Sequence, residues 1–281
     1  MYFIGVDLGT SAVKLLLMEE SGKICNIVSK EYPLFFPHPG WSEQNPEDWW
    51  EQSKEGIKEL ISKIDATEVA GISFGGQMHG LVALDDKDEV IRPAILWNDG
   101  RTTKECDYLN QVIGKERLSA YTANISFTGF TAPKVLWMKN NEPENFAKIH
   151  KIMLPKDYLA FRLSGNYSTD VSDASGTLFF DVKNRCWSEE MCEICSIKTS
   201  WLPKVYESYE EVGTLLPELA KELGVSDQVK IVAGAGDNAA AAVGTGTVGD
   251  GACNISLGTS GTVFISSDKF GVDENLSLIH I

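Results

Sequence analysis

The segment 231–246, IVAGAGDNAAAAVGTG, places one acidic residue between an apolar run and an alanine-rich run. The apolar run predicts the end of a buried strand over 230–233, and Gly234 and Gly236 permit a tight backbone path. Asp237 then falls at a predicted helix N-cap, where the helix dipole keeps a carboxylate ionised. An ionised carboxylate in this position is suited to proton transfer or to simple helix capping, and only partners elsewhere in the chain decide between the two.

A turn near the N-terminus supplies candidate ligands for an anion. The run 2–6 predicts a strand, Asp7 to Ser11 (DLGTS) form a glycine-hydroxyl turn, and the apolar run 12–18 predicts the returning strand of a β-hairpin. Backbone N–H groups, hydroxyls and a nearby ammonium suit an anion such as phosphate. The candidate phosphate ligands of this hairpin are Gly9, Thr10, Ser11 and Lys14.

The same pattern of strand, LGTS turn and strand recurs over 253–265. Two copies so far apart suggest an ancestral duplication, in which two hairpins grip one polyphosphate with Asp237 between them. Gly258 and Thr259 are then the phosphate ligands of the second hairpin. A chance recurrence of four residues is the alternative, and the matching strand flanks disfavour it.

Other polar residues follow predicted strands. Gln77 and His79 come after the run 69–74 and two glycines, and Arg101 follows the apolar run 95–97. Side chains at strand ends build small-molecule sites in α/β folds. The alternatives are a core histidine, a surface glutamine, and an arginine that only pairs with Asp99. The segment 169–177, TDVSDASGT, predicts a hydroxyl-rich loop that lines a cleft or is merely solvated.

Composition limits the partners. The chain has 281 residues, a hydrophobic fraction of 43%, a formal charge of −15 and a pI near 4.7. This charge argues against binding to nucleic acid or to an anionic membrane surface. The first residues lack a secretory signal and no apolar run is long enough to span a membrane, which predicts a cytoplasmic protein without a membrane partner. Six irregularly spaced cysteines predict reduced thiols.

Four helix starts can be predicted from capping residues and prolines. One helix is expected to begin at the cap Asn45-Pro46, one near Thr102 and one within 129–134. The fourth is expected to have Pro155 in its first turn. Strands and helices therefore alternate, and the predicted fold class is α/β.

The motifs together resemble the FGGY carbohydrate kinases. The segments that carry the resemblance are GVDLGTSAVK, PGWSEQNPEDWW, GGQMHG, PAILWNDGR, GFTAPKVLWM, LPKDYL, TDVSDASGT, GAGDNAA and SLGTSG. The resemblance implies two actin-like, ribonuclease-H-like domains around a cleft. Residues 1–246 are expected to form the sugar-binding N-terminal domain, and residues 247–275 the start of a truncated ATP-binding C-terminal domain.

The resemblance also implies roles for single residues. Asp237 matches the catalytic base, and Asp7 matches the acid that supports Mg²⁺ through water. The QMHG segment marks a xylulose pocket, so Gln77, Met78, His79, Asp237, Asn238 and Arg101 are the expected sugar ligands. The implied reaction transfers a phosphoryl group from ATP to D-xylulose and gives D-xylulose 5-phosphate, so sugar and ATP are the expected partners. A kinase for ribulose, gluconate or fuculose and a non-catalytic actin-like sensor are the alternatives.

The last residues do not follow the family pattern. Residues 276–281, LSLIHI, resemble the translation of an adapter used for sequencing libraries, so we expect an artefact there, and a natural apolar strand is the alternative. On the first interpretation the chain as given has no kinase activity. The oligomeric state stays open, with a homodimer among the states considered.

Overall fold

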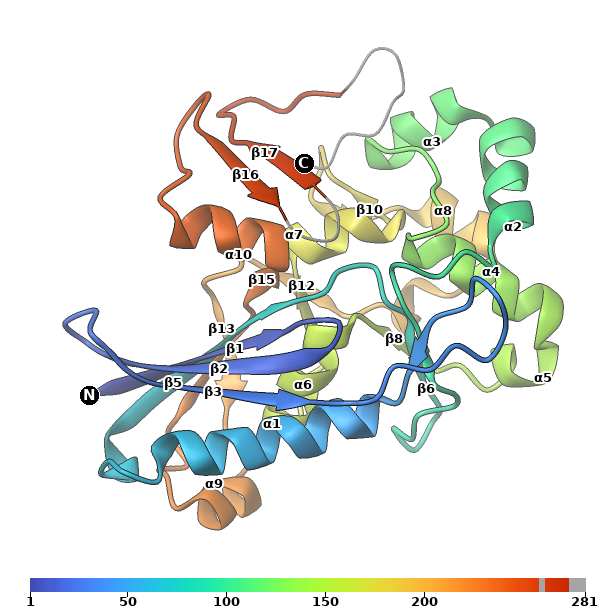
Figure 1. Cartoon of the computed structure of the whole chain (residues 1–281). Coiled ribbons are helices and arrows are strands. Elements are labelled where there is room, and N and C mark those ends of the chain that lie inside the picture. The colour runs from blue at the N-terminus through green and yellow to red at the C-terminus, as the bar shows by residue number, and fades with distance from the viewer. Residues whose placement is uncertain (258–260, 273–281) are drawn as a thin grey trace.

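The computed structural model describes residues 1–257 and 261–272, and its strands and helices are interspersed along the chain (Figure 1). The strands are β1 (Tyr2–Leu8), β2 (Ala12–Glu19), β3 (Ile24–Glu31), β4 (Glu43–Gln44), β5 (Val69–Gly76), β6 (Val82–Leu84), β7 (Ala94–Ile95), β8 (Lys151–Met153), β9 (Ser168–Asp170), β10 (Phe180–Asp181), β11 (Cys186–Trp187), β12 (Lys204–Tyr206), β13 (Glu211–Thr214), β14 (Lys230–Val232), β15 (Ala235–Gly236), β16 (Cys253–Leu257) and β17 (Gly261–Ile265). The helices are α1 (Pro46–Ile61), α2 (Thr103–Asp107), α3 (Lys115–Thr122), α4 (Thr131–Asn141), α5 (Pro143–Phe146), α6 (Pro155–Ser164), α7 (Val171–Ala174), α8 (Glu189–Cys195), α9 (Pro217–Leu223) and α10 (Asp237–Gly244).

Shorter helical turns complete the chain. Three of them are 3₁₀ turns at Ala66–Glu68, Ser175–Thr177 and Thr199–Trp201, and Tyr108–Gly114 form a π-helix between α2 and α3.

One mixed sheet organises the fold. Its strands follow the order β13-β14-β5-β1-β2-β3, and β15 also pairs with β5. The pairs β1–β2, β2–β3 and β13–β14 are antiparallel, whereas β5 runs parallel to β1, β14 and β15. The carboxyl ends of β1, β5 and β15 therefore meet at one edge of the sheet.

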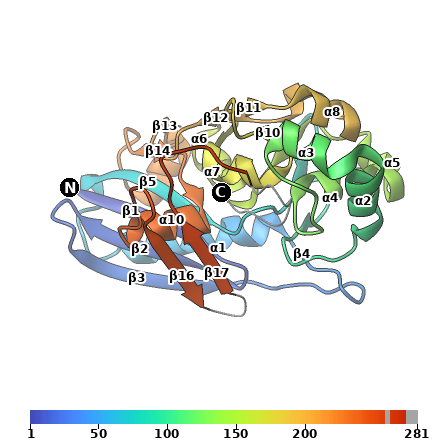
Figure 2. The ribbon, with the colours of Figure 1, turned by 90° about the horizontal axis from the view of Figure 1, so that it is seen from above.

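Two hydrophobic cores organise the molecule, and β6, β7 and β8 contribute residues to both. One joins the sheet to α1, α6 and α9, and the other joins α4 and α8 to β6, β7 and β8. Figure 2 shows the sheet strands β1–β3 at one end and the helices α2–α5 and α8 at the other, with α10 and the β16–β17 hairpin above the sheet end.

Helix α1 illustrates how the sequence determines an element. Asn45 caps it by accepting a hydrogen bond from the Glu47 amide, and Pro46 supplies the fixed first-turn geometry, as predicted. Its buried residues recur at helical spacing, so one face packs on the sheet. A Cβ at Gly56 would stand 2.4 Å from Leu15 Cδ1, so glycine lets the helix approach β2 closely.

Two local predictions were wrong. The segment 169–177 is not a loop, because Asp170 caps α7 by accepting from the amides of Ser172 and Asp173. Asp237 is not the N-cap of α10. Gly236 takes that place, and the Asp237 carboxylate accepts from the neighbouring Asn238 amide at 2.8 Å.

The predictions for the two hairpins and for the last residues can be compared with the structure only in part. The first hairpin and the strands of the second hairpin form as predicted, whereas Gly258, Thr259 and residues 276–281 lie outside the described residues. Within the described part, no helix combines the length and the apolar character needed to span a membrane.

Candidate active site

The end of β5 brings two acidic residues together that are far apart in sequence. In the strand register, Asp7 of β1 lies beside Gly75 on one side of β5, and Ala235 of β15 lies beside the same glycine on the other. Asp237 begins α10 two residues later. The two carboxylates therefore approach each other across β5.

Gly75 keeps the space between them open. A Cβ at this position would stand 3.4 Å from Ala240 Cβ in α10 and 4.0 Å from Asp7 Oδ1. Any side chain longer than a methyl group would therefore fill the gap between the Asp7 carboxylate and α10. The bare glycine therefore keeps a space of about one methyl group between Asp7 and α10.

The two acids perturb each other. Water reaches both side chains, but the surrounding protein atoms reduce their hydration. This loss of hydration raises the pKa of Asp237; the Asn238 amide lowers it and the charge of Asp7 raises it further. Loss of hydration also raises the pKa of Asp7, and Lys14 opposes that shift. Asp237 is thus a stronger base than an ordinary aspartate.

The turn after β5 places His79 in a defined orientation. His79 adopts a left-handed backbone with φ of 69°, and its ring stacks on Phe130 with centroids 4.8 Å apart. Its Nδ1 lies 2.8 Å from the carbonyl oxygen of Gly176. A carbonyl only accepts, so Nδ1 carries the proton, and Nε2 of the neutral ring is an acceptor.

Gly176 is required for this contact. A Cβ there would stand 2.4 Å from His79 Cε1 and 3.2 Å from Met78 Cε. Similarly, a Cβ at Gly236 would stand 2.8 Å from Met78 Sδ. The Met78 side chain therefore lies directly against the turn that carries Asp237.

A small cavity of about 30 Å³ lies between these segments. Its lining residues come from the turn after β5, from α7 and the turn after it, from the start of α10 and from β17, and they include Met78, His79, Asn124, Phe130, Ser172, Ser175, Gly176, Asn238, Ala239 and Phe264. Three predicted sugar ligands, Met78, His79 and Asn238, therefore line one cavity beside Asp237.

The predicted phosphate turn, residues 7–11, is fixed by hydrogen bonds from other segments. The Gly9 amide donates to the Ala12 carbonyl, which closes the hairpin. The Trp97 indole donates to Thr10 Oγ1 at 3.0 Å, and Gln44 Nε2 donates to the Thr10 carbonyl at 2.7 Å. Ser11 and Lys14 are exposed. The turn thus presents Ser11 and Lys14 to solvent, while Trp97 and Gln44 fix its backbone.

Gln77 and Arg101 do not line this cavity. Gln77 is buried, and its Nε2 donates to Gln44 Oε1 at 3.1 Å, which connects it to the phosphate turn. The Arg101 guanidinium contacts Asp99 at 2.7 Å and Glu43 at 2.7 Å, and its side chain is only 1% exposed. It also lies 3.7 Å from the centre of the Trp41 ring. Both side chains are therefore committed to protein contacts.

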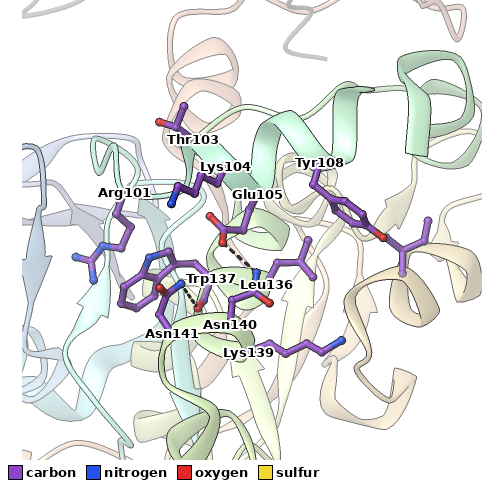
Figure 3. A pocket seen from close by; sticks show the side chains of 11 residues that line it. Arg101, Thr103, Lys104, Glu105, Tyr108, Leu136, Trp137, Lys139, Asn140 and Asn141 are labelled. Atoms are coloured by element: carbon purple, nitrogen blue, oxygen red, sulfur yellow. Dashed lines mark hydrogen bonds between the residues drawn. The ribbon is translucent and has the colours of Figure 1, made fainter. Parts of the chain in front are cut away.

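A second hollow of about 770 Å³ lies around Arg101 (Figure 3). It is lined by residues of α2, α4 and their neighbours, among them Lys104, Glu105, Tyr108 and Lys139, and Glu105 accepts a hydrogen bond from Asn140. Apart from Arg101, none of the predicted site residues lines it. It is distinct from the cavity beside Asp237.

Two buried lysines were missed by sequence reasoning. Lys156 contacts three buried acids, with Nζ 2.6 Å from Asp157, 2.9 Å from Asp170 and 3.6 Å from Asp173. Lys134 donates to the carbonyl oxygens of His79, Gly129 and Phe130. The prolines and aromatic residues beside these lysines predicted helices, but nothing in the linear pattern indicated that their charges would be buried.

The chain is similar to known carbohydrate kinases. Residues 2–244 match the model of the N-terminal domain of the FGGY family of carbohydrate kinases. The xylulose kinase of Escherichia coli (strain K12) is 45% identical over 268 residues, which cover 95% of this chain and 55% of that protein. The chain thus spans about half the length of the curated relatives it matches.

Solved structures give the same result. A structure described as a xyloylose kinase from Brucella ovis matches with a TM-score of 0.94 and 41% identity, over 97% of this chain and 56% of that one. A gluconate kinase from Lactobacillus acidophilus matches with a TM-score of 0.94 and 31% identity, over 98% of this chain and 56% of that one. The α/β fold is therefore the actin-like fold expected from the motifs, and the chain belongs to the FGGY family of carbohydrate kinases.

Proposed function

We propose that this chain is the sugar-binding half of an ATP-dependent kinase that converts D-xylulose to D-xylulose 5-phosphate. The observation that carries the proposal is the position of Asp237, which lies beside a cavity lined by Met78, His79 and Asn238 and opposite Asp7. A base, a polar pocket and a second acid are the parts that phosphoryl transfer to a hydroxyl needs.

In the proposed reaction, Asp237 accepts the proton of the sugar 5-hydroxyl. The hydroxyl oxygen forms a bond to the γ-phosphorus of ATP, the bond from that phosphorus to the β–γ bridging oxygen breaks, and ADP leaves. The raised pKa of Asp237 favours proton acceptance. General-base assistance of this kind contributes about 10²–10⁴-fold in rate.

The sugar is held by the cavity walls. His79 Nε2 is an acceptor for a sugar hydroxyl, because Nδ1 donates to Gly176, and the Asn238 side chain offers both a donor and an acceptor. The Met78 side chain supplies an apolar surface for the carbon chain. Gln77 and Arg101 support the site through Gln44, Glu43 and Asp99 instead of contacting the sugar.

ATP and Mg²⁺ are the proposed co-substrate and cofactor. The exposed carboxylate of Asp7 suits a hydrated hard cation, which prefers one or two carboxylates and keeps several waters. Asp7 would hold Mg²⁺ through water, and the ion would neutralise charge on the transferred phosphate. Gly9, Thr10, Ser11 and Lys14 are the proposed phosphate contacts of the first hairpin, with Gly258 and Thr259 in the second.

A kinase for gluconate or another related sugar is the second candidate. The match to the gluconate kinase favours it, because the backbone similarity to that protein is as high as to the Brucella ovis protein. The curated relatives favour xylulose, since two xylulose kinases among them are 45% and 46% identical. A xylulose kinase structure from Lactobacillus acidophilus also matches with the same identity and TM-score as the gluconate kinase.

Calorimetric titration of the 281-residue chain with D-xylulose, D-ribulose, L-fuculose and D-gluconate tests the substrate. We expect D-xylulose to bind most tightly. If another sugar binds more tightly, that sugar becomes the proposed substrate in place of D-xylulose. If none of the four sugars binds, the proposal of a sugar site is wrong.

A coupled assay of ADP release by a full-length protein that contains this chain tests the activity. Asp237→Asn should still bind D-xylulose but lower kcat by at least about a hundredfold. An Asp237→Asn variant that keeps turnover within tenfold of the unsubstituted enzyme would remove Asp237 from the role of base. Lys148→Met, an exposed change far in sequence from the site, serves as the control.

A further inference from the structure

The backbone that carries Asp237 contains two glycines and has little rigidity of its own. Gly234 adopts φ of 74°, and a Cβ there would stand 2.3 Å from the Phe74 carbonyl oxygen, so only glycine fits. Gly236 is the N-cap of α10 and has no side chain that can bond to the first turn. Glycine backbones lose the most conformational freedom on ordering. The start of α10 therefore depends on contacts from other segments.

Ser172 of α7 provides such a contact. The Gly236 amide donates to Ser172 Oγ at 3.1 Å. The Ser172 hydroxyl in turn donates to Asp170 Oδ2 at 2.5 Å. A hydroxyl has only one proton, so donation to Asp170 directs its lone pairs toward the Gly236 amide. The carboxylate of Asp170 thus determines the orientation of the bond that holds Gly236.

Asp170 is itself held on every side. It is fully buried, and its carboxylate accepts from the Ser172 amide at 2.9 Å and from the Ser208 hydroxyl at 2.6 Å. Lys156 Nζ lies 2.9 Å from Asp170 Oδ1. Charge-assisted hydrogen bonds of this kind are about twice as strong as neutral ones. The buried Lys156 thus anchors a chain of contacts that runs through Asp170 and Ser172 to Gly236.

We propose that Ser172, oriented by Asp170, is a positioning residue that fixes the turn before Asp237 and so holds its carboxylate beside the sugar cavity. The proposal has two parts. The geometric part is that the Ser172 hydroxyl holds the Gly236 amide, and the kinetic part, that this contact supports catalysis, rests on the proposed function. Removing the Ser172 hydroxyl frees the Gly236 amide, and the first residue of α10 then samples other orientations.

Hydrogen exchange of the Gly236 amide, measured by NMR on the 281-residue chain, tests the geometric part. Loss of a hydrogen bond worth about 1 kcal/mol should speed exchange in Ser172→Ala about fivefold or more. Ser172→Thr keeps the γ-hydroxyl and should exchange like the unsubstituted chain. Ser164→Ala is the matched control, because it removes a buried serine hydroxyl that donates to Ala160 in α6 and does not contact Gly236. Unchanged exchange in Ser172→Ala would overturn the proposal.

Steady-state kinetics of a full-length enzyme test the kinetic part. Ser172→Ala should lower kcat about fivefold to tenfold and leave the KM for D-xylulose within twofold, because the base is misplaced while the sugar contacts remain. Ser172→Thr should restore kcat. Ser172 also lines the cavity, so a raised KM with unchanged kcat would identify a direct sugar contact and overturn the positioning role.

Failure of the inference differs from failure of the proposed function. If the unsubstituted full-length enzyme releases no ADP with D-xylulose, the proposed function is wrong, whatever the exchange at Gly236. If Asp237→Asn keeps full turnover, only the role of Asp237 as the base is wrong. If Asp237→Asn is inactive while Ser172→Ala keeps its kcat, the base stands and the positioning role is wrong.

Discussion

Lys134→Met should change the pH dependence of stability in a way that can be worked out from the structure. Lys134 is fully buried, and its ammonium donates to the backbone carbonyls of Phe130 at 3.1 Å and His79 at 3.2 Å. Burial lowers the pKa of Lys134 to about 7; Asp99 and Cys106 oppose this shift and Arg101 adds to it. In the unfolded chain the lysine pKa is about 10.4.

The sign and the size follow from proton linkage. Between these two pKa values the unfolded chain binds more protons than the folded chain, so the Lys134 contribution to stability rises with pH. The penalty for burying the ammonium is complete below about pH 7 and is lost as the pH approaches about 10.4. From pH 7 to pH 9 the unsubstituted chain should gain about 2 kcal/mol from this residue alone.

The methionine side chain is similar in length to that of lysine, but it donates no hydrogen bond and does not titrate. Lys134→Met leaves the carbonyls of Gly129 and Phe130 without this donor, at a cost of about 1–3 kcal/mol, whereas the His79 carbonyl keeps the Thr131 hydroxyl. The variant should therefore be less stable at pH 9, and its deficit should shrink by about 2 kcal/mol at pH 7.

Urea unfolding of the 281-residue chain at pH 7, 8 and 9 measures this difference directly. Titrating groups that do not interact with Lys134 are common to both proteins and cancel when the two free energies of unfolding are subtracted. Asp99 and Cys106, which interact with Lys134, remain part of the measured difference. Lys148→Met, which removes an exposed lysine, should give a difference that does not vary with pH. A deficit of Lys134→Met that stays constant or grows toward pH 7 would refute the reasoning.

Two further predictions concern catalysis in a full-length enzyme. His79→Leu should raise the KM for D-xylulose about tenfold to a hundredfold, because an unmet sugar hydroxyl costs about 1–3 kcal/mol, and should leave the KM for ATP nearly unchanged. Equal effects on both substrates would indicate a folding defect instead. Asp7→Asn should move the acid limb of the kcat/KM profile to lower pH, because the charge of Asp7 contributes to raising the pKa of Asp237; a limb that stays in place or moves to higher pH would contradict this coupling.

Local patterns were enough to predict the elements that carry the site. The hairpin of β1 and β2, the Asn45 cap of α1 and the placement of Asp237 at the start of a helix all depend on neighbours within a few residues. The partners of Arg101 could be predicted only in part, because Asp99 is two residues away whereas Glu43 is far away in sequence. Gln77 pairs with Gln44 across 33 residues, a contact that no periodicity encodes.

The segment 169–177 was wrongly predicted as a loop for a related reason. Hydroxyl and acidic residues are typical of solvated turns, but here Asp170 and Asp173 are buried against Lys156, a residue of α6. The sequence contains both halves of this ion cluster, yet only the fold brings them together. Buried charges are tolerated where they are paired, and pairing is a tertiary property.

The ion cluster connects the geometry of the site to its charge. Lys156 faces three carboxylates, so one cation is available for three buried acids. Burial raises the pKa of Asp173 well above its usual value, Lys156 opposes the shift, and the charges of Asp157, Asp170 and Asp237 add to it. Asp170 keeps a lowered pKa, because Lys156 and the hydroxyls of Ser172 and Ser208 outweigh the effect of burial. Asp170 therefore remains the charged anchor of the turn before the proposed base.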